Sequence, residues 1–283
     1  MVEVGARLTW FAHLVLTVGV VVFAFPIYMA VIGSTHDVGT IGRGNLPLRP
    51  GDHALENYRQ AWVQGSGQRT RATPVARMMA NSFVMAGVIT AGKIAVSILS
   101  AYAVVFFRFP LRMAFFWMIF VTLMLPVEVR IIPTFKVLSD LGMINTFGGL
   151  TVPLMASATA TLLFRQFFLT IPDELVEAAK IDGAGALRFF RHVVVPLSRT
   201  NIAALSVILF IYGWNQYLWP LLVTTSRHMD TIVIGITKMI GTGDSQIDWN
   251  LIMATTVLAL LPPVAVVVLM QRWFVRGLID TEK

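Results

Sequence analysis

The stretch WFAHLVLTVGVVVFAFPIYMAVI, from Trp10 to Ile32, decides the class of this fold. No Asp, Glu, Lys or Arg occurs between Arg7 and Asp37. Because a helix rises about 1.5 Å per residue, about 20 apolar residues cross the hydrocarbon core of a bilayer. The stretch is therefore predicted to be a transmembrane helix. It is longer than the apolar region of a signal peptide and lacks a small-residue cleavage site, so we interpret it as a retained span.

Working outward from this stretch, five further apolar windows are long enough to span a membrane. With the first at about 10–32, they lie at about 79–107, 113–135, 142–164, 200–224 and 249–271. Strands of a membrane barrel would be about 10 residues long with alternating polarity, and these windows are longer and apolar on all sides. The predicted fold class is all-α, a polytopic membrane protein with six transmembrane helices in a single domain over residues 1–283.

The composition agrees with a membrane protein. The 283 residues are 56% hydrophobic and 13% charged, against about 25% charged in soluble domains. The net charge of +7 is interpreted as Lys and Arg flanking the spans and meeting anionic headgroups, with no role for nucleic acid. The chain has no cysteine, which excludes disulfides and cysteine metal sites.

The distribution of Lys and Arg gives a weak indication of orientation. Six spans place both termini on one side, and that side carries eleven basic residues against ten on the other. Without the long first loop the other side keeps four, which favours cytoplasmic termini and a cytoplasmic 165–199 loop.

No catalytic or metal site is predicted. Residues 87–94, GVITAGKI, fall one residue short of a phosphate-binding loop, and Ile94 stands where Ser or Thr would hold magnesium. The five His residues are scattered without metal-ligand spacing. The chain is therefore not expected to be an enzyme by itself.

The loop between the fourth and fifth windows, residues 165–199, has helical signals. Thr170 is predicted as an N-cap, Pro172 suits the first turn, and the helix ends at Gly183 or Gly185. A second short helix is expected at about 187–194. Small and charged residues on the first helix, such as Ala178 and Glu177, suit a knob that docks into a partner. An ordinary surface helix–turn–helix explains the same pattern, and the residues alone leave both readings open.

The sequence EAAKIDGAGALRFFRHVVVP, from Glu177 to Pro196, resembles the loop of membrane subunits of bacterial binding-protein-dependent ABC importers. That pattern is Glu-Ala-Ala, three residues, Gly, nine residues and Ile-x-Leu-Pro. Glu177, Ala178, Ala179, Gly183 and Pro196 match it, while Val193 and Val195 replace the Ile and Leu. Further stretches, such as residues 81–112, 115–135 and 210–222, are similar to the maltose-type permeases for carbohydrate uptake.

The resemblance implies a multi-pass permease of the bacterial inner membrane. Its partners would be a second permease subunit, two ATPase subunits that bind ATP and Mg, and a periplasmic or lipid-anchored binding protein. The chain itself would bind no cofactor. The 165–199 loop would be a cytoplasmic coupling helix, with ATPase-coupling residues Glu177, Ala178, Ala179, Asp182, Gly183 and Pro196.

The implied cargo is sn-glycerol-3-phosphate or a glycerophosphodiester. An oligosaccharide or other polyol is the alternative cargo. A secondary transporter without an ATPase is the alternative class, although no internal repeat typical of such folds is evident.

Candidate substrate-path residues come from the polar positions inside the spans. Lys93 shares a helix face with Ser82, Ser97 and Ser100, and a charge within a span faces protein or water. The alternative is a Lys that snorkels or pairs with a carboxylate.

In the fifth window the candidates are Trp214, Asn215 and Gln216, because amides and aromatic faces suit polyols. Helix–helix contact and an interfacial aromatic belt are the alternatives. Glu128 and Arg130, between Pro126 and Pro133, are expected to lie in an irregular segment near water and to take part in an intrachain or intersubunit ion pair.

Overall fold

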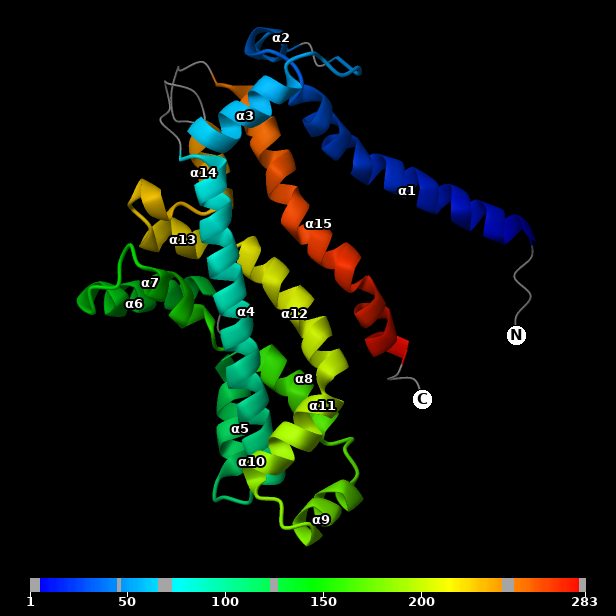
Figure 1. Cartoon of the computed structure of the whole chain (residues 1–283), viewed down its shortest axis with the longest axis vertical. Helices are drawn as coiled ribbons and strands as arrows, with labels where there is room; N and C mark the ends of the chain where they lie inside the picture. The colour runs from blue at the N-terminus through cyan, green and yellow to red at the C-terminus, as the bar shows by residue number, and fades with distance from the viewer. Residues whose placement is uncertain (1–5, 45–46, 66–72, 123–126, 241–246, 280–283) are drawn as a thin grey trace. The chain divides into compact units, whose positions relative to one another are not determined.

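The structure is a computed structural model that describes residues 6–44, 47–65, 73–122, 127–240 and 247–279. Over these ranges the backbone forms helices joined by turns and loops, without a β-strand (Figure 1). The chain divides into two compact units. Unit 1 comprises residues 1–78 and 235–261, and unit 2 comprises residues 79–234 and 262–283.

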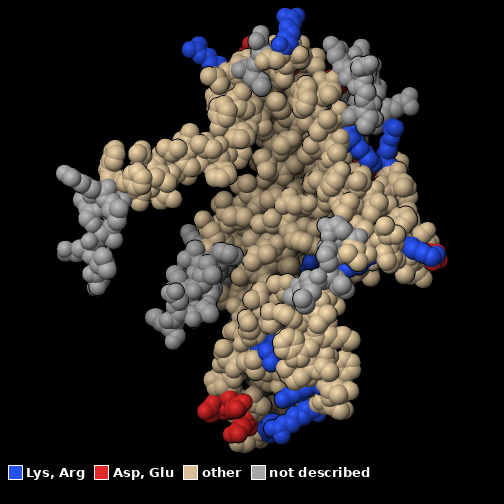
Figure 2. Space-filling view, turned by 180° about the vertical axis from the view of Figure 1, so that it is seen from behind, with Lys and Arg blue, Asp and Glu red and all other residues tan. Residues whose placement is uncertain are grey.

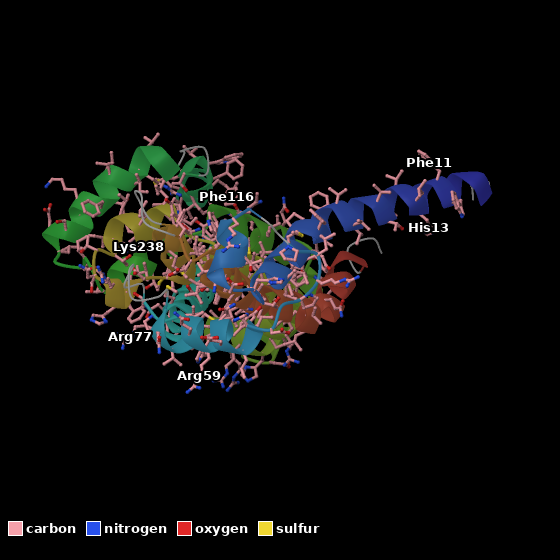
Figure 3. All side chains as sticks on the ribbon, turned by 90° about the horizontal axis from the view of Figure 1, so that it is seen from above. Phe11, His13, Arg59, Arg77, Phe116 and Lys238 are labelled. Atoms are coloured by element: carbon pink, nitrogen blue, oxygen red, sulfur yellow. The ribbon has the colours of Figure 1, made fainter. Side chains whose placement is uncertain are left out.

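Unit 1 contains one long exposed helix, α1 (Ala6–Gly33), and a polar part that includes α2 (Val38–Gly42) and α3 (Ala54–Gln64). All three helices lie wholly within this unit. The side chains of α1 are mostly exposed along the helix, among them Phe11 and His13 (Figure 3). An uninterrupted apolar helix with so little protein around it is what a bilayer requires, because its backbone groups are paired internally.

Buried amides hold the polar part of unit 1 together. Asn57 on α3 donates through Nδ2 to the carbonyl oxygens of Ser34 at 2.9 Å and His36 at 2.8 Å. Its Oδ1 accepts from Asn250 Nδ2 at 2.8 Å. Asn57 thereby joins the end of α1 to the beginning of α15 (Trp249–Ile279), the long helix that begins in this unit.

Unit 2 is built around α4 (Val75–Phe106), which enters from unit 1. The other helices are α5 (Arg112–Val121), α6 (Val127–Asp140), α7 (Phe147–Thr151), η2 (Val152–Leu154), α8 (Ala158–Phe168), α9 (Asp173–Ile181), α10 (Ala186–Phe189), η3 (Phe190–Val194), α11 (Val195–Leu197), α12 (Arg199–Trp214), α13 (Leu218–Val223) and η4 (Arg227–Met229). Helix α14 (Ile232–Ile240) begins in unit 2 and continues into unit 1 from residue 235. Two apolar clusters fill this unit. One includes Ile98, Phe164 and Leu209, and the other includes Met85, Leu150 and Trp219.

Helices α4 and α12 lie side by side because Gly213 permits a close approach. A Cβ atom at Gly213 would lie 2.9 Å from the Cα of Ala86. Beside this contact Phe83 meets Trp214 edge-on with ring centroids 5.2 Å apart. Small residues at such crossings are typical of membrane helices, since packing rather than water drives their association.

The six predicted windows agree only in part with the helices. Three described helices, α1, α4 and α15, are long and apolar enough to span a membrane, and up to five spans result if each of two bent pairs is one span. The fourth window is a pair, residues 147–154 and 158–168, bent by 47°. The fifth is not one helix, because α12 ends at Trp214 and α13 begins at Leu218.

The third window also differs from one straight helix. It covers α5, residues 123–126, which lie outside the described residues, and the first part of α6. Figure 1 shows α6 running across the direction of α4. The segment after Pro126 was expected to be irregular and is instead helical through Pro133. A proline within a membrane helix is tolerated where neighbouring groups satisfy the freed carbonyl.

Candidate functional site

Helix α9 follows from local sequence signals. Asp173 and Glu174 lie in its first turn and Lys180 in its last, where each charge complements the helix dipole. The prediction of Thr170 as the N-cap is wrong: Pro172 holds that position in an extended conformation. The Thr170 hydroxyl donates to the Phe167 carbonyl oxygen at 2.7 Å, so this side chain belongs to the end of α8.

The chain reverses after α9 at Gly183, one of the two predicted stops. Gly183 has φ of +67°, a left-handed conformation that glycine adopts without strain. The Ala184 amide donates to the Ala179 carbonyl oxygen at 2.8 Å, which closes the turn. Gly185 has φ of −67° and precedes α10. Gly183 is therefore the residue whose backbone needs glycine.

The outer surface of α9 is free of protein contacts among the described residues. Glu177, Ala178 and Asp182 are exposed, and none of the helix is buried. Two apolar side chains project nearby, Ile181 at 86% exposure and Leu187 at 78%. Figure 2 shows acidic and basic side chains grouped at the end of unit 2 that carries α9 in Figure 1. This combination of apolar projection and charge is typical of a protein-binding surface.

The inner side of α9 is anchored. Val176 and Ala179 pack against the apolar cluster that contains Phe168, Ile171 and Phe189. Tyr102 on α4 adds a polar tie by donating its hydroxyl to the Ala186 carbonyl oxygen at 2.8 Å. A force applied to α9 therefore reaches α4 through packed side chains.

The second predicted helix of the loop, at about 187–194, contains an irregularity that the sequence did not indicate. It is α-helical over α10 and a π-helix over η3, where the Val195 amide donates to the Phe190 carbonyl oxygen. Half-buried Pro196 follows at the start of α11 and has no N–H to donate. After the buried Ser198 the chain bends by 71° into α12.

Lys93 occupies an unusual position within α4. Its side chain is only 7% exposed, and Nζ lies 3.7 Å from the ring centroid of Tyr212. With the described residues it forms no hydrogen bond and no ion pair, so the alternative of a carboxylate partner finds no such partner among them. Among the described residues the charge that acts on it is another cation, Arg130 of α6. The Glu128 side chain, half of the predicted ion pair with Arg130, lies outside the described residues.

The serines predicted to share a face with Lys93 serve mainly in packing. Ser97 is buried and donates to the Ser157 carbonyl oxygen at 3.1 Å. Ser82 is buried and accepts from the Ile232 amide at 2.8 Å. Ser100 donates to the Val96 carbonyl oxygen of its own helix.

The three candidates at the end of α12 differ in accessibility. Trp214 is buried and stacks on Phe210 with centroids 5.9 Å apart. Asn215 caps the helix and is exposed, while Gln216 is half-buried and donates to the Tyr212 carbonyl oxygen at 3.2 Å. Sequence reasoning missed Tyr212 as the partner of Lys93, because nothing in either local sequence signals the contact.

Comparison with known proteins identifies the class. The family described as "Binding-protein-dependent transport system inner membrane component" matches residues 93–280. The chain therefore belongs to this family of membrane permease subunits, as the 177–196 motif indicated. Its members are transport components rather than enzymes, and an importer of this class works with an ATPase and a binding protein.

Individual relatives are similar over nearly the whole chain. Proteins named "sn-glycerol-3-phosphate transport system permease protein UgpE" are 60% identical in Brucella melitensis and 61% in Agrobacterium fabrum, each covering 96% of both chains. The Yersinia pestis relative of that name is 56% identical over 100% of both.

A solved structure gives the fold. It is a bacterial ABC transporter involved in import of the acidic polysaccharide alginate, with a TM-score of 0.82 and 20% identity. The match covers 97% of this chain and 99% of that one. The chain thus has the all-α membrane fold of an ABC permease.

Proposed function

We propose that this chain is the transmembrane subunit of an ABC importer that carries sn-glycerol-3-phosphate or glycerophosphodiesters across the bacterial cytoplasmic membrane. The observation that carries the proposal is the 56–61% identity, over nearly full length, to relatives from several genera that bear one transport name. Lys93 supports an anionic cargo, because a buried cation favours the passage of negative charge.

The complex contains this chain, a second permease subunit as a heterodimer, two ATPase subunits and a periplasmic or lipid-anchored binding protein. Within it the chain forms one permease domain over residues 1–283 with six transmembrane helices. Five are α1, α4, α15 and the two bent pairs, each pair counting as one span, and the sixth is the predicted span at about 113–135. The largely uncovered α1 and the exposed apolar faces of unit 2 support an assembly in which lipid and a second subunit cover them.

Helix α9 docks into a groove of an ATPase subunit. Glu177 offers a charge, and the small side chain of Ala178 lets the groove come close to the exposed side of the helix. Ala179 seats α9 on the apolar cluster beneath it, and Gly183 allows the reversal. Asp182 and Pro196 complete the matched loop by ending α9 and starting α11. Exposed apolar Ile181 and Leu187 beside a charged rim support this role, since interfaces bury apolar groups at their centre.

Both termini and the 165–199 loop are cytoplasmic, and the 33–78 and 224–250 loops are outside. The absence of cysteine makes this simple to test, because one introduced thiol is the only thiol of the chain. The Ser66→Cys variant should react with an impermeant maleimide in intact cells. Thr170→Cys, at an exposed position of the 165–199 loop, should react only after the cells are opened. Labelling of Ser66→Cys only in opened cells would contradict the orientation.

Lys93 lies on the substrate path, with Asn215 and Gln216 able to contact polyol hydroxyls and Ser97 and Trp214 as supporting wall. The test is uptake of radiolabelled sn-glycerol-3-phosphate by proteoliposomes that hold the assembled importer and its binding protein. Lys93→Gln should lower uptake while assembly and basal ATP hydrolysis persist. Lys136→Gln is the matched control, because Lys136 pairs with Asp140 at 3.1 Å on the surface.

The same assay separates the alternatives. If the importer carries an oligosaccharide and not sn-glycerol-3-phosphate, the proposed cargo is wrong and the alternative cargo is right. If uptake continues without the ATPase subunits, the protein is a secondary transporter and not part of an ABC importer.

A further inference from the structure

The surroundings of Lys93 contain a second cation that has no described counter-ion. Arg130, in the first turns of α6, is exposed. The next residue, Ile131, packs in the same apolar cluster as Ile89, one turn before Lys93 on α4. This packing holds the two cations in one region of unit 2, where the charge of Arg130 acts on Lys93. With the described residues the Arg130 guanidinium forms no hydrogen bond or ion pair. Lys136, farther along the same helix, does pair, with Asp140.

Two like charges held near each other are unfavourable unless an anion joins them. Lys93 is 7% exposed, so water screens its charge poorly. The Tyr212 ring at 3.7 Å offsets part of the desolvation through its negative face, but a ring attracts a cation less strongly than an anion does. The arrangement therefore suits a ligand that brings its own negative charge.

We infer that Lys93 and Arg130 form a two-cation site, bounded by the Tyr212 ring, that favours a dianionic phosphate monoester over a singly charged phosphodiester. This rests on the proposed function, which names both kinds of ester as cargo. A phosphate monoester carries about −1.5 to −2 at neutral pH, because its second pKa is about 6. A diester keeps one negative charge, so each cation attracts it about half as strongly.

This charge difference predicts a specific ratio. Since the Coulomb energy scales with ligand charge, the loss factor for a dianion is about the square of the factor for a monoanion. If Arg130→Gln lowers diester uptake about threefold, monoester uptake should fall about tenfold. Loss of a residue that only lines the path or supports the fold would lower monoester and diester uptake by the same factor.

The experiment measures initial uptake of sn-glycerol-3-phosphate and of glycerophosphoglycerol in proteoliposomes with the complete importer and one binding protein. Dividing each variant rate by the wild-type rate for the same ester removes the binding protein's own preference. Arg130→Gln should reduce uptake of the monoester more than uptake of the diester. Arg130→Lys keeps the positive charge and should restore most of the wild-type preference for the monoester. Tyr212→Phe should keep the wild-type ratio of monoester uptake to diester uptake, because the ring face and not the hydroxyl contacts Lys93. Lys136→Gln serves as the control on α6.

Equal loss of both esters, or no loss, in correctly assembled Arg130→Gln would overturn the two-cation site while leaving the proposed function intact. A wild-type importer that carries neither ester would refute the proposed function as well. Glu128→Gln gives an independent check. An internal counter-ion at Glu128 would make this variant lose assembly or uptake, which contradicts the inference. Unchanged or increased monoester uptake supports it.

Discussion

Gly183 offers a direct test of the coupling role of α9. Its φ of +67° costs an L-residue about 1–2 kcal/mol, which lowers the population of the native turn about 5–30-fold. A Cβ atom at this position meets nothing within 4 Å, so the isolated permease has room for a side chain. Gly183→Leu should therefore insert and assemble, yet hold α9 poorly and project into the proposed ATPase groove.

The assay compares cargo imported per ATP hydrolysed in proteoliposomes. We expect Gly183→Leu to retain basal hydrolysis and lose most coupled uptake. Gly183→Asn separates the two causes, because Asn tolerates the left-handed region but still adds a side chain. It should couple better than Gly183→Leu and worse than wild type.

Gly185→Leu is the matched control. Gly185 lies in the same loop, has ordinary φ of −67° and also has open space around its Cβ position. It should couple nearly as wild type does. Wild-type coupling in Gly183→Leu, or equal uncoupling in Gly185→Leu, would refute the reasoning.

Three further predictions concern the frame around the sites. Gly213→Ala should destabilise the purified complex by about 1–3 kcal/mol in thermal melts, because its Cβ would press on Ala86, whereas Gly87→Ala, with nothing within 4 Å, should be neutral. Asn57→Ala should cost about 2–4 kcal/mol, since it removes three hydrogen bonds and leaves buried carbonyls unpaired, and a loss no greater than that of exposed Arg59→Ala would contradict this. The hydrogen bonds of Asp37, chiefly from the Thr40 hydroxyl, lower the pKa of that carboxyl below its usual 3.8. The cap of α2 should thus persist above that value and fail as pH falls through the lower folded pKa, which amide exchange at Gly39 and Thr40 would detect.

The sequence predicted the long helices well because their signal is local. The windows at 10–32, 79–107 and 249–271 correspond to α1, α4 and α15, where apolar residues run without interruption. Hydropathy, however, does not show the direction in which a helix axis runs. It did not reveal the 47° bend before α8 or the break between Trp214 and Leu218, which depend on packing within unit 2.

For the candidate sites too, the sequence predicted the features that depend on local signals and missed the contacts between separate helices. The position of α9 and its stop at Gly183 followed from capping and glycine chemistry, which act over a few residues. The approach of Lys93 to Tyr212 and Arg130 joins three separate helices, and no pattern within any one of them indicates it. Ser97 was predicted by helical spacing to share a face with Lys93, but spacing alone did not show that its hydroxyl is already used by Ser157.

The π-helix at Phe190–Val194 fixes how far the part of the loop before it is rotated relative to α12. The buried side chains on either side of its turn, Phe189 at the end of α10 and Val194 at the end of η3, are five residues apart, one more than an α-helix would set between neighbours on a face. Each residue in a helix turns the chain by about 100°, so deleting one residue here would rotate everything before it by that angle relative to α12. The direction in which α9 points around the axis of the 186–197 helical segment thus depends on residue count as well as on residue type.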